Sequence, residues 1–294
     1  MSEQNRLGRI GVWSIAWSTA LGGDGSAYTA EFDEAAAELE ELGYGTLWLG
    51  GSPAASFAAP VLRATTRLTV ATGIVSIWDY TAEEAAAQRA VLERDHPGRF
   101  LLGLGVSHSL MTERYRRPYS AMRDYLTALD AAPVPVPSDA RVLAALGPKM
   151  LELSRDRAAG AHPYLVTPEH TAHAREVLGG EALLAPELKV IVSSDRDAAY
   201  DLARGYLANY LRMANYTRSF ERLGFTDEDF RDGGSDRLID AVFAIGDPDA
   251  IAARATEFLT AGADHLAVQT VTADPRSDLP RAQWRQLAEA LPMK

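Results

Sequence analysis

The sequence predicts an α/β fold in which eight parallel strands form a (β/α)8 TIM barrel. Three observations support this prediction. Strand-like and helix-like segments alternate along most of the 294 residues, as in successive βαβ units. Residues 100–106 (FLLGLGV) form a continuous apolar run, which is typical of a strand buried on both faces. The length suits one barrel, and the alternation resumes after the only proline-rich connector, so we expect a single domain over residues 1–294.

The first half of the chain is expected to contain four of these strands. A helix is predicted between the first two strands, because Phe32 and Leu39 lie on one face of a helical pattern. Gly43 indicates its end, since glycine is common just past the end of a helix. Thr81 and Glu84 form a capping box, which begins a helix ahead of the fourth strand. Apolar and β-branched runs predict the strands themselves at residues 9–17, 46–49, 68–76 and 100–106.

The second half continues this alternation, with one long exception. Gly147, Thr167 and Asp247 each lie at a predicted helix start. Residues 195–237 are mostly helical without a strand between, so we expect a helical insertion after strand 7. The remaining strands are predicted at residues 141–146, 163–166, 188–192 and 265–271, and further helices at 119–129 and 279–291.

Composition limits the classes of function. The chain has no cysteine, which excludes a disulfide framework, a Cys-ligated metal and a thiol nucleophile. Its net charge of −11 repels nucleic acid and anionic membranes, so neither is expected as a partner. The longest apolar runs are far below the roughly 18 residues of a membrane span, and the polar start has no apolar signal core. We expect a cytoplasmic protein that acts on a small molecule.

In a (β/α)8 barrel the active site lies at the C-terminal ends of the strands. His108 directly follows the fourth strand, and a histidine ring titrates near neutral pH, so it is a candidate to move a proton. Trp17 and Trp78 also lie at predicted strand ends, where an indole can stack on a flat ring. Residues 146–149 (LGPK) lie where the fifth strand becomes a helix, and backbone N–H groups, the helix dipole and the lysine attract an anion there.

Three other motifs are better explained without a function of their own. Residues 103–108 (GLGVSH) begin like a dinucleotide-binding fingerprint, but the third glycine and the later acidic residue are missing. Residues 105–109 (GVSHS) lack the final glycine of a serine-hydrolase elbow. His170 and His173 lie three residues apart beside two glutamates, yet no third ligand is recognisable. A solvated helix start is the better interpretation of these histidines, and we predict no metal site.

Several separated segments together resemble a known family. Residues 71–108 (ATGIVSIWDYTAEEAAAQRAVLERDHPGRFLLGLGVSH) resemble the luciferase-like monooxygenase superfamily, most closely the branch of oxidoreductases that uses the deazaflavin coenzyme F420. The segments RVLAALGPKMLEL, HPYLVTPEHTAHAREVLG and AGADHLAVQ are similar to an actinobacterial subgroup of that branch. The resemblance covers most of the chain in matching order.

The resemblance implies positions that hold the coenzyme. The third strand would end in a bulge behind the coenzyme ring, with a non-prolyl cis peptide bond at Gly73-Ile74 and Val75 next to it. The loop after the fourth strand would bind the phosphate through Val106 and Ser107. A second phosphate-binding turn corresponds to Ala144, Ala145, Leu146 and Gly147.

The sequence departs from these relatives at the end of the second strand. Several relatives have an acidic residue and a histidine there, lining the reaction site, whereas this chain has Gly50 and Gly51. Neither glycine can move a proton, which argues against an alcohol or sugar dehydrogenase mechanism and leaves these positions to the substrate pocket. Residues 131–139 are also a shorter segment than in many relatives, which opens the pocket or changes the contact of the homodimer that the resemblance implies.

We therefore expect an oxidoreductase that transfers a hydride between coenzyme F420 and a small, mostly apolar organic substrate. His108 occupies a position that is glutamate in the sugar-phosphate dehydrogenases of the family, and it would move the accompanying proton. Ser107, Leu146, Gly147 and Lys149 would hold the phosphate. Two alternatives remain open at this point: a monooxygenase that uses flavin mononucleotide (FMN), and a barrel that binds coenzyme without catalysis.

Overall fold

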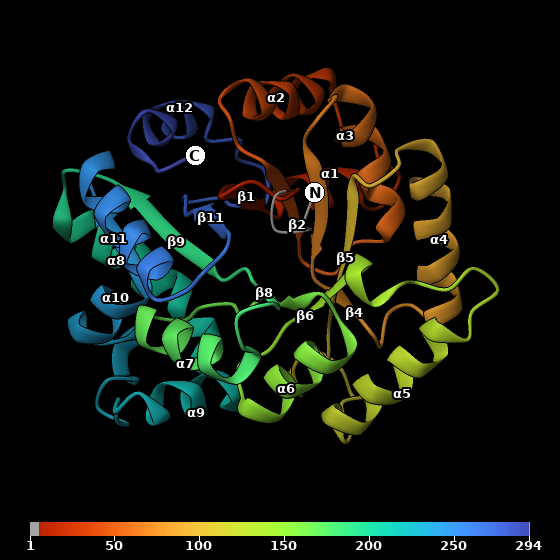
Figure 1. Cartoon of the computed structure of the whole chain (residues 1–294). Helices are drawn as coiled ribbons and strands as arrows, with labels where there is room; N and C mark the ends of the chain where they lie inside the picture. The colour runs from red at the N-terminus through yellow and green to blue at the C-terminus, as the bar shows by residue number, and fades with distance from the viewer. Residues whose placement is uncertain (1–5, 294) are drawn as a thin grey trace.

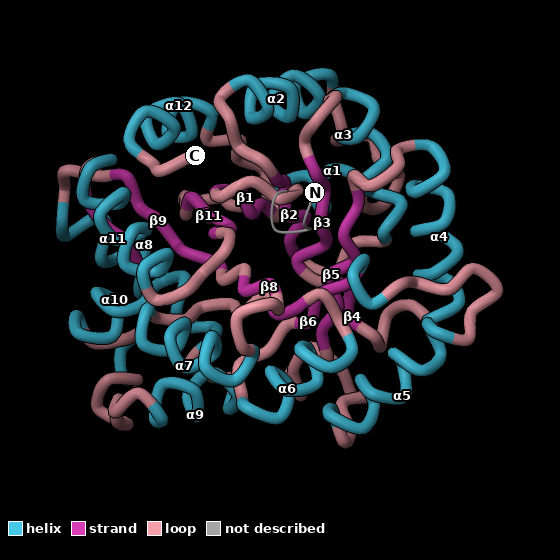
Figure 2. The backbone as a smooth tube through the Cα atoms, viewed as in Figure 1, coloured by secondary structure: helices cyan, strands magenta, loops and turns pink. Residues whose placement is uncertain are grey.

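The computed structural model describes residues 6–293 and has the predicted (β/α)8 barrel architecture. Figures 1 and 2 show the strands gathered at the centre of the molecule with the helices arranged around them. Every strand pair among the described residues is parallel. The first six strands of the barrel are β1 (Ile10–Ser14), β2 (Thr46–Gly50), β3 (Thr69–Gly73), β5 (Phe100–Gly105), β6 (Arg141–Leu143) and β7 (Gly160–Ala161).

An interrupted seventh strand joins the two ends of the sheet. Its first part, β8 (Leu183–Leu184), pairs with β7. After Ala185 and Pro186 the chain continues as β9 (Glu187–Val192), which pairs with β11 (Leu266–Thr270). Because β11 also pairs with β1, the hydrogen-bonded ladder runs around the whole barrel.

The helices cover the outside of this sheet, and their ends follow the sequence signals. The capping box of Thr81 and Glu84 is present, and the side chains of Thr167 and Asp247 cap the helices that follow them. The helices are α1 (Ala16–Leu21), α2 (Ala30–Glu41), α3 (Ala58–Ala64), α4 (Ala82–Asp95), α5 (Pro118–Asp130), α6 (Pro148–Arg157), α7 (Pro168–Leu178), α8 (Arg196–Tyr210), α9 (Ala214–Arg222), α10 (Asp236–Val242), α11 (Pro248–Thr260) and α12 (Arg281–Ala290), with single 3₁₀ turns η2 (Ala55–Phe57), η3 (Ser138–Ala140) and η4 (Arg231–Gly233).

The predicted helical insertion after strand 7 is confirmed and consists of α8, α9, η4 and α10. Its apolar side chains form a cluster of their own, which includes Leu207, Phe220 and Ile239 and extends to Phe243. The chain then forms β10 (Phe243–Gly246), which pairs with residues 189–192 of β9, while β11 pairs with residues 187–190 on the other edge of the same strand. The insertion is therefore packed on the C-terminal half of β9, beside the end of the barrel where an active site is expected.

The structure corrects several predicted boundaries. The predicted strand at 163–166 is wrong, because the strand is β7 at Gly160–Ala161 and the next residues form a loop. The first strand ends at Ser14 rather than Trp17, since the chain turns at once into α1. The predicted strand at 68–76 is divided into β3 and β4 (Val75–Ser76). Four further elements, α1, α3, β8 and β10, are absent from the prediction because they are too short to produce a clear periodic pattern.

None of the helices in the described part of the chain has both the length and the apolar character that crossing a bilayer requires.

Candidate active site

A cavity of about 1530 Å³ lies at the C-terminal ends of the barrel strands. Residues that immediately follow the strands line it, and the insertion helices α8 and α9 contribute further side chains. The residues contributed just after strand ends include Ile15, Gly51, Ile74, Val106, Ala144, His162 and Thr272. Loops at this end of a (β/α)8 barrel are where active sites of the fold are built.

Most of the residues proposed from the sequence line this cavity together. They are Gly51, Gly73, Ile74, Val106, Ser107, His108, Ala144, Ala145, Leu146, Gly147 and Lys149. Four others lie outside its lining, namely Val75, Gly50, Trp17 and Trp78. Val75 is in β4 with its side chain buried in the core, next to the bulge rather than in the cavity wall.

The prediction that Trp17 contacts a ligand is wrong. Because the chain turns into α1 directly after β1, the Trp17 side chain is 0 % exposed and packs against the rings of Phe32 and Trp284. Trp78 is half-buried and is used differently: its indole Nε1–H donates to the Val106 carbonyl at 2.6 Å. Trp78 therefore braces the loop after β5 instead of contributing a wall of the cavity.

Trp13 explains why position 50 is a glycine. A Cβ atom at Gly50 would lie only 2.4 Å from the Trp13 ring, so the indole occupies the space that a side chain at residue 50 would need. The ring also covers Gly73, and its Nε1–H donates to the Gly73 carbonyl at 3.1 Å. Trp13 thus forms the floor of the cavity, and Gly50 lies beneath it rather than in the substrate pocket as predicted.

The bulge expected after the third strand is present. The Gly73-Ile74 peptide bond is cis, and the chain resumes pairing at Val75. A Cβ atom at residue 105 would lie 2.5 Å from Ile74 Cδ1, so Gly105 leaves room for the isoleucine side chain. Ser107 has a φ of 55°, in the left-handed region that residues other than glycine seldom adopt, at the turn that directs His108 into the cavity.

His108 is held by residues of the insertion. Its Nδ1 lies 2.9 Å from Asn215 Oδ1, and its ring centroid lies 5.2 Å from that of Tyr216. Burial lowers the pKa of His108 below its ordinary value, and the hydrogen bond to Asn215 opposes this shift only in part. The imidazole is therefore neutral at neutral pH. Donation from Nδ1–H to Asn215 leaves Nε2 as the basic nitrogen.

Positive charge gathers where the sequence predicted an anion site. Gly147 is the N-cap of α6 and, because it has no side chain, it leaves the first backbone N–H groups of that helix without a side-chain acceptor. Lys149 lines the cavity beside it. The guanidinium of Arg222, from α9, lies 3.8 Å from the Cβ position of Gly147. His170 supports this turn, because its Nε2 lies 3.0 Å from the Leu146 carbonyl oxygen. The sequence could not reveal Arg222, which lies 75 residues away in the chain.

The metal interpretation of His170 gains no support. The interpretation as a solvated helix start is wrong for His170, which is buried against Leu146. It agrees with His173, which is exposed and lies 3.7 Å from Glu176. Within residues 6–293, no group of three or more His, Asp or Glu side chains is arranged to hold a metal ion.

Sequence reasoning missed His162, which follows β7 at the floor of the cavity. Its Nδ1 lies 2.7 Å from the Ala185 carbonyl oxygen, and its ring stacks on Trp48 at 4.0 Å. Burial lowers the pKa of His162 to about 4, so the ring is neutral with its proton on Nδ1. The buried Nε2 has no protein partner among the described residues, and it lies 3.4 Å from the Cβ position of Gly73. It is an acceptor placed behind the bulge.

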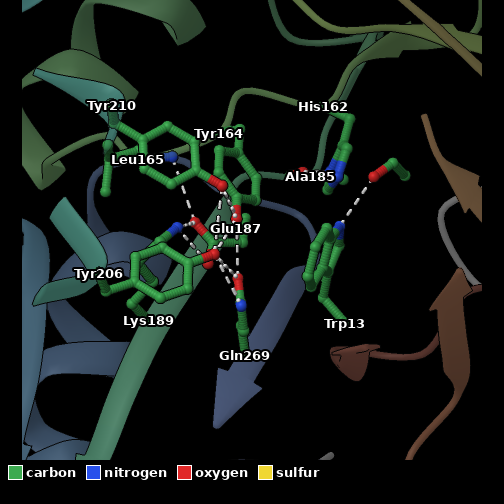
Figure 3. Close-up of polar contacts among 11 residues, drawn as sticks. Trp13, His162, Tyr164, Leu165, Ala185, Glu187, Lys189, Tyr206, Tyr210 and Gln269 are labelled. Carbon is green, nitrogen blue, oxygen red and sulfur yellow. Dashed lines mark hydrogen bonds and ion pairs between the residues drawn. The ribbon is translucent and has the colours of Figure 1, made fainter. Parts of the chain in front are cut away.

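Three tyrosines and Gln269 form a second polar group, shown in Figure 3. We call Tyr164, Tyr206 and Tyr210 the tyrosine cluster. Their hydroxyl oxygens lie 2.6 Å (164 to 206), 3.1 Å (164 to 210) and 3.2 Å (206 to 210) apart. All three side chains and Gln269 line the cavity. Tyr164 comes from the loop after β7, Gln269 from β11 and the other two from successive turns of α8.

A buried ion pair lies beneath this cluster. Lys189 Nζ is 2.8 Å from both carboxylate oxygens of Glu187, two residues away on the same face of β9. The ammonium group lies 3.6 Å from the centroid of the Tyr164 ring. Burial lowers the pKa of Lys189 to about 8 and raises that of Glu187, and the attraction between the two groups opposes both shifts.

Comparison with known proteins agrees with this architecture. The model of a family described as luciferase-like monooxygenase matches residues 9–265. No curated protein gives a significant match to the chain.

Solved structures with the same fold cover almost the whole chain. An F420-dependent secondary alcohol dehydrogenase in complex with an F420–acetone adduct is 13 % identical, with a TM-score of 0.73 over 97 % of this chain and 98 % of that one. A coenzyme F420-dependent tetrahydromethanopterin reductase from Methanopyrus kandleri is 15 % identical, with a TM-score of 0.74 and the same coverage. The oxygenating constituent of 3,6-diketocamphane monooxygenase from Pseudomonas putida, in complex with FMN, is 13 % identical, with a TM-score of 0.66 over 97 % of each chain. At these identities the likeness establishes the fold.

Proposed function

The chain belongs to the luciferase-like monooxygenase family, and from that premise we propose that it is an oxidoreductase that uses coenzyme F420 to reduce or oxidise a small organic substrate. The supporting observation is that one cavity contains the bulge at Gly73-Ile74, the neutral imidazole of His108 and the cationic turn at Gly147. These are the positions that the family resemblance assigns to the coenzyme ring, the moving proton and the phosphate.

The residues present fit a flat coenzyme with a phosphate tail. On the ring side, His162 Nε2 is a buried acceptor that has no partner within residues 6–293, and it lies behind the bulge. On the phosphate side, the N-terminus of α6 has no side-chain cap and is flanked by Lys149 and Arg222. Deazaflavin, when bound, would supply the two-electron chemistry. The protein would orient the reactants, exclude water and move the proton.

His108 is the residue that we propose moves this proton. Its Nε2 is the basic nitrogen, and the ring is neutral at neutral pH, so it can accept a proton from a substrate hydroxyl and return it in the reverse direction. Asn215 and Tyr216 keep the ring in place through the contacts described above. The insertion contributes a large part of the cavity wall, and the mainly apolar lining of the cavity suits a mostly apolar substrate.

A coenzyme titration tests the proposal directly. Purified protein is mixed with F420 or with FMN, and quenching of the coenzyme fluorescence is followed to saturation. We expect F420 to bind at least about 10-fold more tightly than FMN, which corresponds to roughly 1.4 kcal/mol. Riboflavin, which lacks the phosphate, serves as the matched control and is expected to bind more weakly than FMN. A preference for FMN would replace the F420 proposal with the monooxygenase alternative.

Two alternatives have specific support. The fold shared with the FMN-bound oxygenating constituent from Pseudomonas putida supports an FMN-dependent monooxygenase that acts with molecular oxygen and a reductase. Gly50 and Gly51, which cannot move a proton, support a coenzyme-binding barrel without catalysis. Coenzyme binding without turnover over a broad panel of carbonyls, enones and alcohols would favour the second alternative.

We also propose a homodimer, which sedimentation of the purified protein would test.

We predict that the cations at the Gly147 turn hold the phosphate. Replacing Lys149 or Arg222 with alanine removes one charge-assisted contact from an exposed site, so each variant is expected to bind F420 about 3- to 10-fold more weakly. Binding by the natural protein should weaken as salt rises, since these local cations act against a net charge of −11.

The control for these variants is Arg94→Ala, at the exposed end of α4 outside the cavity, which makes the same change in net charge. Fluorescence titrations at low and high salt measure all three variants. Equal weakening in R94A would attribute the effect to the overall field of the protein and would contradict a local phosphate site.

A further inference from the structure

The tyrosine cluster contains more hydrogen-bond donors than dedicated acceptors. Three phenol hydroxyls and the amide of Gln269 bring five polar hydrogens together, and Gln269 Oε1 is the one atom of the group that only accepts. That oxygen receives the hydroxyls of Tyr164 at 2.9 Å and Tyr206 at 3.3 Å, while Gln269 Nε2 donates to Tyr206 at 2.9 Å. Such a group can donate a hydrogen bond to an acceptor oxygen that a ligand supplies.

Tyr210 is the hydroxyl best able to serve a ligand. Its contacts within the cluster are the two long ones, at 3.1 and 3.2 Å, and both are with other hydroxyls. Tyr206 and Tyr164, in contrast, are joined at 2.6 Å and both contact Gln269. Turning the Tyr210 proton toward the cavity would therefore cost a weak contact and leave the stronger ones in place.

The electrostatics of the cluster favour a neutral or partly charged oxygen over a full anion. Burial raises the pKa of all three tyrosines, so their hydroxyls stay protonated at neutral pH and act as donors. Lys189, under the face of Tyr164, is neutralised by Glu187. The group therefore offers oriented dipoles without net charge, which is the setting that suits a carbonyl oxygen.

The cluster lies in the same wall as the residues of the proposed function. Figure 3 shows Trp13, which donates to the Gly73 carbonyl, next to Tyr164, and their ring centroids are 5.4 Å apart. On the other side of the cluster, the ring centroid of Tyr210 lies 5.2 Å from that of Tyr216. The Tyr216 centroid lies 5.2 Å from the centroid of the His108 ring. Aromatic contacts thus connect the bulge to the proposed proton-transfer residue by way of the cluster.

We propose that the tyrosine cluster binds the carbonyl oxygen of the substrate, through Tyr210 first and Tyr206 second, and that the substrate class is therefore ketones, aldehydes or enones with an apolar body. This inference rests on the proposed function, because the bound carbonyl compound is a substrate only if the protein is the oxidoreductase proposed above. Binding of the carbonyl oxygen itself does not depend on which coenzyme the protein uses. The same hydroxyls would stabilise negative charge that develops on that oxygen. The apolar body would lie against the cavity wall formed by the insertion.

A ketone fluorophore tests this binding site in the coenzyme-free protein. The probe is 6-propionyl-2-(dimethylamino)naphthalene, whose emission moves to longer wavelength when its carbonyl accepts a hydrogen bond. We expect saturable binding with the long-wavelength emission of a hydrogen-bonded carbonyl. Tyr210→Phe and Tyr206→Phe should each bind about 3- to 10-fold more weakly and emit at shorter wavelength. The double variant should show the larger effect on both readouts.

Matched controls separate the cluster from general loss of the cavity. Tyr119→Phe removes a hydroxyl from an exposed tyrosine that also lines the cavity, and it should leave affinity and emission unchanged. Unfolding curves establish that each variant is folded, since phenylalanine keeps the ring and its packing. The inference would be overturned if the Tyr206/Tyr210 double variant bound the probe as tightly as the natural protein does and with the same emission wavelength. It would also be overturned if Y119F changed both readouts as much as the cluster variants do. Because F420 takes no part, failure here is distinct from failure of the coenzyme titration.

Discussion

His108→Ala is expected to lower kcat by about 10²- to 10⁴-fold while the Kd for the coenzyme stays nearly unchanged. The side chain lies in the cavity with Nδ1 bonded to Asn215, so its loss removes the proton carrier without touching the cationic turn at Gly147. Turnover is measured with the substrates that the carbonyl, enone and alcohol panel yields, and binding by fluorescence titration.

The pH profile gives a second readout for this residue. Since burial lowers the pKa of His108, the basic form that accepts a proton persists below the ordinary pKa of histidine. In the oxidising direction, kcat of the natural protein should therefore stay constant through neutral pH and fall only as the pH drops through the lowered pKa. His173→Ala, an exposed histidine on α7, is the control and should change neither kcat nor its pH profile. Unchanged turnover in H108A would remove the residue from the mechanism.

Glu187→Leu is expected to lower the free energy of unfolding by about 3–5 kcal/mol. The substitution leaves the ammonium of Lys189 fully buried with no carboxylate to compensate it. Urea denaturation at neutral pH measures the loss. The double variant E187L/K189M removes both charges and should recover most of the stability, because a buried pair is seldom better than well-packed apolar residues of similar size.

The pH dependence of this loss has a definite sign. The pKa of Lys189 is lowered from 10.5 to about 8 in the folded protein, so between these values the unfolded chain binds the proton more strongly. The stability of the natural protein therefore rises with pH across that window. Glu187 raises the pKa of Lys189, so in E187L this pKa falls further and the variant begins to gain stability at a lower pH than the natural protein does. The defect of E187L should therefore shrink as the pH rises toward 8. A single variant as stable as the natural protein, or a double variant no better than the single one, would contradict this account of the pair.

Only part of the candidate site could be predicted from the sequence. His108 and the turn at Gly147 follow predicted strands directly, so the topology alone brings them to one end of the barrel. Trp17 was misplaced by the same reasoning, because a strand that ends three residues earlier turns the side chain from the cavity into the core. An error of a few residues at a strand end is enough to exchange a wall residue for a core residue.

The functional groups that distant segments contribute to the site could not be predicted from the sequence. Tyr206, Tyr210 and Arg222 lie in the insertion, where a helical pattern identifies the helices but not the direction in which they dock. His162 gives no sequence signal, because the strand before it contains only two residues and the apolar run that predicts a strand comes after it. Trp13 could not be distinguished from a core residue of β1 until its ring was seen over Gly50 and Gly73.

The alternation of strands and helices, the helix caps and the end of the barrel at which chemistry is expected all follow from the order of the amino acids. These properties depend on local periodicity and on neighbours within a few residues, which the order of amino acids contains directly. Two features are visible only in the folded chain. Trp13 occupies the space of a side chain at residue 50, and three hydroxyls and an amide from three separate segments meet above a buried ion pair. Such contacts depend on how whole elements pack against one another, and many arrangements of those elements are compatible with the same local pattern.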